Sequence, residues 1–181
     1  MDLTEHELSS DTLYDGGLFK VKRDVVRLPN DNTSHRIYVT HPGAVVIVPI
    51  LANGHIVLER QYRYALREAF IELPAGKIDA NEAPLHTGQR ELLEETGYTG
   101  TDWVKLGLQH PCIGYSNEVI HTYLARGLTA GAHQRDPDET LEVFELSFSA
   151  CMDMIKNGEI TDGKTIIALF LAEKYLLDHG N

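Results

Sequence analysis

Short apolar runs, alternating or rich in β-branched residues, recur along the chain and predict strands more often than helices. Turn-forming residues separate them, at positions 30–32 and at Asn53 and Gly54. The pattern therefore predicts antiparallel hairpins built from residues 18–28, 35–40, 44–51 and 56–63. Further strands are expected at residues 70–73, 104–109, 119–125 and 141–147.

Three segments show the three- to four-residue apolar spacing of an amphipathic helix. The first starts at Pro84, which suits a first helical turn, and stops before Gly97, a residue type that commonly follows a helix. The other two cover residues 148–157 and about 164–177 and close the chain. In the first helix an apolar stripe can pack on a sheet, made of Leu85, Gly88, Leu92, Leu93 and Thr96.

The opposite face of this first helix is predicted to carry Glu91, Glu94 and Glu95 outward. Three carboxylates at that spacing repel one another, whereas Mg²⁺ prefers oxygen ligands and bridges carboxylates to phosphates. Arg90 lies four residues before Glu94, where its guanidinium could orient the carboxylate, and both are candidate catalytic residues. Any one of these residues alone would be typical of a solvated helix face. Together they indicate a divalent-metal site for a pyrophosphate.

Residues 76–98 resemble the signature of the Nudix hydrolases at every specified position, from Gly76 through Glu82 and Arg90 to Gly97. This resemblance implies an α/β fold, an α/β/α sandwich with a mixed central sheet, preceded here by antiparallel strands. It also implies Mg²⁺- or Mn²⁺-dependent hydrolysis of a nucleoside diphosphate linked to another group.

Motifs outside residues 76–98 are similar to the ADP-ribose pyrophosphatase branch of that family. They are Gln61-Tyr62-Arg63, residues 72–76 and residues 114–118. The branch implies cleavage of ADP-ribose to AMP and ribose 5-phosphate. It also implies that two or three metal ions are held by the backbone carbonyl of Ala75 with Glu91, Glu94 and Glu95.

The same resemblance implies further roles outside the metal site. Arg63 would bind the pyrophosphate, and Gly114 and Glu118 would contact substrate or metal. Glu139, in the acidic stretch 135–139, would be the general base, although a solvated loop carboxylate is the alternative. Arg36 would reach the nucleotide of a neighbouring subunit in a homodimer, or else be a surface arginine on an edge strand.

The length of 181 residues fits a single domain, with residues 1–43 as dimer-forming strands and 44–181 as the catalytic core. With 27 acidic and 16 basic residues the net charge is −11, which disfavours binding to nucleic acid or to an anionic membrane. Cys112 and Cys151 form no metal or disulfide motif, and no targeting or membrane-spanning segment is apparent. A soluble cytoplasmic protein is expected.

Two other functional hypotheses remain. One is a Nudix enzyme for another diphosphate, such as GDP-mannose, NADH or a dinucleoside polyphosphate, which Ile113 leaves open because a proline is common at that place in the ADP-ribose branch. The other is a nucleotide-sensing module without turnover. Such a module would be expected to lack a carboxylate of the signature, and none is missing.

Overall fold

The computed structural model describes residues 1–135 and 139–179, and each strand and helix expected from the sequence occurs within them. The strands are β1 (His6–Asp15), β2 (Lys20–Arg27), β3 (Thr33–Thr40), β4 (Ala44–Pro49), β5 (His55–Arg63), β6 (Glu68–Glu72), β7 (Ala75–Lys77), β8 (Tyr98–Thr99), β9 (Asp102–Gln109), β10 (Ile120–Arg126), β11 (Thr129–Ala130) and β12 (Leu141–Ser147). The helices are α1 (Pro84–Glu91), α2 (Phe148–Asn157) and α3 (Gly163–His179), and α1 continues into a π-helical turn, η1 (Leu92–Thr96).

The described residues form two units, one made of residues 1–42 and 110–119 and the other of the remaining chain. The first unit is an antiparallel sheet in the order β1-β2-β3, and β2 and β3 form the predicted hairpin. Segment 110–119 joins this unit because the N–H of Val39 donates to the carbonyl of Tyr115 and the N–H of Asn117 donates to the carbonyl of Val39. Strand β1 escaped prediction because it is exposed along its whole length, so no buried face imposes a period on it.

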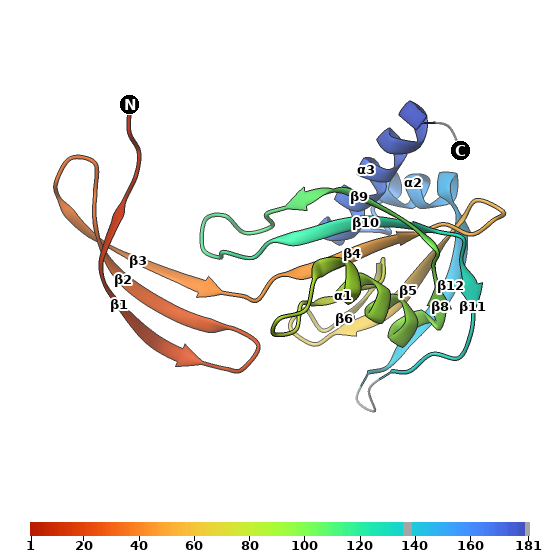
Figure 1. Cartoon of the computed structure of the whole chain (residues 1–181), viewed down its shortest axis with the longest axis horizontal. Coiled ribbons are helices and arrows are strands. Elements are labelled where there is room, and N and C mark those ends of the chain that lie inside the picture. The colour runs from red at the N-terminus through yellow and green to blue at the C-terminus, as the bar shows by residue number, and fades with distance from the viewer. Residues whose placement is uncertain (136–138, 180–181) are drawn as a thin grey trace. The chain divides into compact units, whose positions relative to one another are not determined.

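The second unit contains a four-stranded sheet in the order β7-β4-β10-β9. Strands β4 and β10 are parallel, while β7 and β9 run antiparallel to their neighbours, so the sheet is mixed. Val46 and Val48 of β4 join the core cluster that contains Leu169 of α3, and Val45 and Ile47 join the cluster beside α1. Strand β4 is apolar at successive positions because both faces of this sheet are covered. The predicted α/β/α sandwich is confirmed (Figure 1).

Residues 44–51 and 56–63 do not form the hairpin that was predicted for them. Both edges of β4 are occupied, by β7 and β10, so β5 has no edge of β4 on which to pair. The two segments are linked beside the turn by a bridge between Ile50 and Ile56 and by the hydrogen bond from the N–H of Leu51 to the carbonyl of His55, and no ladder extends into β4. Strand β5 instead forms the centre of a second antiparallel sheet, in the order β12-β5-β6.

The start of α3 is tied to the end of β6. Asp162 accepts a hydrogen bond from the N–H of Thr165 at 3.0 Å, which caps the first turn of the helix. The hydroxyl of Thr165 in turn accepts one from the N–H of Leu73 at 2.9 Å. These bonds place Lys164 beside Glu72. Among the described residues, no helix is both long and apolar enough to cross a membrane.

Candidate active site

The helix of the Nudix-like segment starts and stops where the sequence predicted. Pro84 is its first residue, and Gly97 follows η1 with a φ of 79°. A Cβ at Gly97 would lie 2.6 Å from the carbonyl oxygen of Gly131, so this position requires glycine for its backbone angle and for close approach. The loop after β11 thereby packs directly on the end of the helix.

The prediction that all three glutamates face outward is wrong. Glu91 and Glu95 are buried, at 8% and 2% relative exposure, and Glu94 is partly exposed. The reason is that β7 covers them: a Cβ at Gly76 would come within 1.9 Å of the Glu91 carboxylate. In addition, the N–H of Ala75 donates to Oε2 of Glu95 at 3.0 Å. The carboxylates therefore lie between the helix and β7 instead of on a solvated face.

Arg90 connects the carboxylates of this segment. Its guanidinium donates to Glu91 at 2.8 Å, to Glu94 at 2.9 Å and to both oxygens of Glu82 at 3.0 Å. The hydrogen bond from Arg90 is the main cause that lowers the pKa of Glu82 to about 2. The predicted contact with Glu94 is present, and the guanidinium fixes the rotamers of three carboxylates at once. Its part in catalysis stays a prediction.

Burial raises the pKa of Glu91 to about 6, with Arg90 opposing the shift. Burial also raises the pKa of Glu95, and the charges of Glu59, Glu91 and Glu139 add to this increase. Carboxylates that are costly to ionise in the free protein gain when a cation neutralises them. Protonation and cation binding compete for Glu91. The pH dependence of the free energy of unfolding, measured without a cation, therefore tests whether the pKa of Glu91 is raised.

We expect the free energy of unfolding in the presence of a chelator to fall between pH 4.5 and 7. The pKa of Glu91 is higher in the folded chain than the ordinary 4.5, so its contribution is complete below pH 4.5 and is lost as the pH rises through about 6. The loss is on the order of 2 kcal/mol for Glu91 alone. Urea unfolding at pH 4.5 and 7 measures it. Glu91→Gln should reduce the fall by that amount, and an equal fall in the variant would contradict the assignment.

Two carboxylates of the neighbouring sheet, which the sequence analysis did not single out, complete the cluster. Glu59 of β5 and Glu72 of β6 are each 1% exposed and lie opposite each other in the strand register. Glu72 is paired with Arg63, at 2.7 Å from each oxygen, and with Lys164. Their sequence signal is weak because glutamate within a β-strand is usually a solvent-facing residue.

Arg63, the predicted pyrophosphate ligand, therefore lies beside the cluster but is engaged with a buried carboxylate. Two parallel N–H···O bonds to Glu72 hold its guanidinium, and its side chain is 41% exposed. Only the solvent-exposed part of the Arg63 guanidinium can therefore contact a ligand. Binding of phosphate by Arg63 stays a prediction.

Glu139 is partly buried, and its charge raises the pKa of Glu91, Glu95 and Glu59. Its neighbours Asp136, Pro137 and Asp138 lie outside the described residues. The preceding residue in the described chain, Arg135, donates to the carbonyl of Glu95 at 2.7 Å and to that of Leu141 at 3.1 Å. Arg135, not noted as an individual site residue from the sequence, thus links the end of η1 to the start of β12.

The other predicted substrate contacts belong to the amino-terminal unit. Arg36 is paired with both oxygens of Glu5, at 2.8 and 2.5 Å. Arg36 and Gly114 line one cavity of about 390 Å³, together with Tyr38 and Asn117. Glu118 lies 3.5 Å from Nδ1 of His41. The unit thus brings Arg36 and Gly114 to a common hollow, while their contact with a nucleotide stays a prediction.

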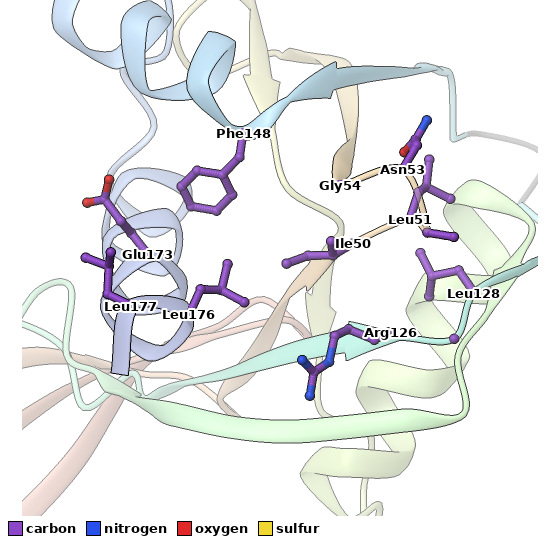
Figure 2. A pocket seen from close by; sticks show the side chains of 12 residues that line it. Ile50, Leu51, Asn53, Gly54, Arg126, Leu128, Phe148, Glu173, Leu176 and Leu177 are labelled. Carbon is purple, nitrogen blue, oxygen red and sulfur yellow. The ribbon is translucent and has the colours of Figure 1, made fainter. Parts of the chain in front are cut away.

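A larger cavity, of about 680 Å³, lies elsewhere in the second unit. Figure 2 shows it between the end of β4, the β10 end and the last turns of α3. Its lining is mostly apolar, with Ile50, Leu128 and Leu176 as examples, and Arg126 and Glu173 at its edge. None of the clustered carboxylates lines it, so size alone does not identify the chemical site.

The carboxylates of the second unit fit a divalent cation by their chemistry. Glu91, Glu94 and Glu95 supply hard oxygen donors, and the raised pKa values of Glu91 and Glu95 mean that a cation would relieve unfavourable charge. Both oxygens of Glu59 lack a hydrogen-bond partner in the described structure. No ready-made group of three ligands occurs within residues 1–135 and 139–179, so side chains would have to close on an ion.

Comparison with known proteins identifies relatives along nearly the whole chain. A NUDIX domain model matches residues 40–169. The methanol dehydrogenase activator of Bacillus methanolicus is 38% identical, covering 91% of this chain and 90% of its own length. The ADP-ribose pyrophosphatase of Bacillus subtilis is 33% identical over 92% and 91%, and a GDP-mannose pyrophosphatase of Escherichia coli is 32% identical over 97% of both. The solved structure of an ADP compounds hydrolase has a TM-score of 0.85 at 24% identity, covering 99% of this chain and 98% of that one, and supports the fold.

Proposed function

Because the chain belongs to the NUDIX family, we propose that it hydrolyses the pyrophosphate of ADP-ribose, or of a related ADP-sugar. The observation that carries the proposal is the set of carboxylates at Glu91, Glu94 and Glu95, of which Arg90 holds the first two and the N–H of Ala75 holds the third. Such a set suits divalent cations that bind a pyrophosphate. The adenosine and ribose specificity rests on the relative from Bacillus subtilis.

In this proposal Glu91, Glu94, Glu95 and the carbonyl of Ala75 would hold Mg²⁺ or Mn²⁺, as two or three ions. When bound, the cation supplies positive charge that stabilises the negative charge developing on the phosphoryl oxygens. Arg90 keeps Glu91 and Glu94 oriented for that task, at 2.8 and 2.9 Å. The raised pKa values of Glu91 and Glu95 support the need for a counter-charge.

The bond changes follow from hydrolysis of an anhydride. A water oxygen bonds to one phosphorus, and the bond from that phosphorus to the bridging oxygen breaks, which yields AMP and ribose 5-phosphate. In this proposal Glu139 accepts the proton of the water, and its interaction with the charges of Glu91 and Glu95 indicates that it lies near them. Arg63 contributes positive charge on the exposed side of its pair with Glu72.

We further propose that residues 1–43 build a homodimer in which Arg36 reaches the nucleotide of the neighbouring subunit. Apolar side chains on the β1-β2-β3 unit are exposed, among them Leu8, Leu13, Tyr14 and Ile37, and a dimer would bury such residues. Arg36 would have to exchange Glu5 for the ligand. The cavity that it shares with Gly114 supports a ligand-binding role.

GDP-mannose is the second candidate substrate, because the relative from Escherichia coli with that name covers 97% of the chain. NADH, dinucleoside polyphosphates and a non-catalytic sensing role are the remaining alternatives. They share the carboxylate set and differ in the ligand pocket, so a direct comparison of substrates separates them.

We expect ADP-ribose to be cleaved fastest in a panel with ADP-glucose, GDP-mannose, NADH and a diadenosine polyphosphate. The measurement is release of nucleotide monophosphate with Mg²⁺, with Mn²⁺ and with chelator. Cleavage should stop with chelator, because the carboxylates then lack their counter-charge. Fastest cleavage of GDP-mannose would show that GDP-mannose, not ADP-ribose, is the preferred substrate. Binding without cleavage of any compound would support a nucleotide-sensing module.

A further inference from the structure

Glu59 is a buried carboxylate that the Nudix-like segment does not contain. It lies in the middle of β5, between the buried Leu58 and the exposed Arg60, at 1% relative exposure. Neither of its oxygens has a hydrogen-bond partner in the described part of the chain. A charged group in that position destabilises the fold unless something neutralises it, so it requires an explanation.

The cations near Glu59 are already engaged by its neighbour. Glu72 lies directly opposite Glu59 in the β5–β6 register, so both carboxylates leave the same face of the sheet. Arg63 donates two hydrogen bonds to Glu72, and Lys164 bonds to Glu72 and to Asp162. Of these two carboxylates, Arg63 and Lys164 contact only Glu72. Among the described residues, no side-chain cation contacts Glu59.

The charge of Glu59 also acts on the carboxylates of the helix. It interacts with the charge of Glu95, so the two carboxylates lie near each other. Glu139 in turn acts on Glu59. The two sources of carboxylates, the β5–β6 sheet and the α1–η1 helix, therefore contribute to one electrostatic cluster. Arg90 contacts the helix side of that cluster, at Glu91 and Glu94, and its other partners in the described chain are Glu82 and the carbonyl of Lys77.

We propose that Glu59 is an additional ligand for a divalent cation, one that shares this ion with Glu95 and is supplied by β5 instead of by the Nudix-like segment. A cation between the two would neutralise both buried charges and satisfy the oxygens that lack partners. This inference rests on the metal dependence in the proposed function. It concerns binding of the ion itself, so it can be tested without substrate.

The test is a titration of the full chain with Mn²⁺, followed by electron paramagnetic resonance of the free ion, at pH 7.5 and without nucleotide. Glu59→Gln keeps the size of the side chain and removes its charge. We expect this variant to bind the ion at least tenfold more weakly, or to lose one equivalent. The control is Glu68→Gln, on the exposed end of β6, which should bind as the parent does. A dissociation constant within twofold and equal stoichiometry for Glu59→Gln would overturn the proposal.

Glu59→Val provides a second readout if Glu59→Gln folds poorly, because valine suits a buried strand position. The melting temperature is measured with chelator and with Mg²⁺. The rise caused by Mg²⁺ should be clearly smaller in the variant than in the parent chain, since ion binding to the folded state is what produces it. An equal rise would overturn the proposal. Failure of the parent chain to cleave ADP-ribose would instead count against the proposed function, because neither measurement here uses a substrate.

Discussion

Glu95→Gln is expected to lower kcat at saturating Mg²⁺ by about 100- to 1,000-fold without loss of the fold. Glu95 is 2% exposed, and the N–H of Ala75 donates to its Oε2 at 3.0 Å. Glutamine offers an oxygen for that bond but no negative charge. Burial and the charges of nearby carboxylates raise the pKa of Glu95, so the charge itself does not stabilise the metal-free chain. The variant should therefore separate metal-dependent catalysis from folding.

Two measurements on this variant are decisive. The first is kcat at increasing Mg²⁺ until the rate no longer rises, and the second is the free energy of unfolding with chelator, which should equal or exceed that of the parent chain. Glu68→Gln is a matched control, because it removes a carboxylate charge from an exposed position of β6. A kcat within twofold of the parent at saturating Mg²⁺ would refute the assignment of Glu95 to the metal.

Arg90→Ala is expected to lower the free energy of unfolding by about 2–4 kcal/mol and to abolish most activity. The guanidinium is 29% exposed and binds Glu82, Glu91 and Glu94 together with the carbonyl of Lys77. Its removal leaves carboxylates close to one another with no counter-charge from this residue. The change should also raise the pKa of Glu82 toward its ordinary value, since Arg90 is the main cause of the lowered pKa.

Urea unfolding at pH 7 with chelator measures the effect, and added Mg²⁺ should recover part of the lost stability by replacing the missing positive charge. Lys174→Ala is the control, because Lys174 and Asp178 form an ion pair four residues apart on the exposed part of α3. Its loss should cost less than about 1 kcal/mol. If the two substitutions destabilised the chain equally, Arg90 would be an ordinary surface residue and its role in holding the carboxylates would be wrong.

Local patterns in the sequence were sufficient for most elements of the fold. Strand β12 and helix α2 begin and end at the predicted residues, because an apolar period and a capping residue act within a few positions of the chain. Helix α1 with its π-helical turn η1 also starts at Pro84 and stops before Gly97 for local reasons. In contrast, the pairing of β4 with β10 and β7 depends on strands far away in the sequence, and the predicted β4–β5 hairpin was wrong for that reason.

Some features of the candidate site could likewise be predicted from the sequence, and others depend on tertiary contacts. The spacing of Glu91, Glu94 and Glu95 and the partner of Glu94, Arg90, were readable from the sequence, because residues three and four apart meet on one helical face. Their burial under β7, the engagement of Arg63 with Glu72, and the unpaired Glu59 on β5 were not readable. Each of these depends on contacts between segments that are distant along the chain. The sequence by itself thus determined the donor chemistry and the family, whereas only the tertiary structure decided which charges are buried together, because burial and pairing are properties of the packed chain.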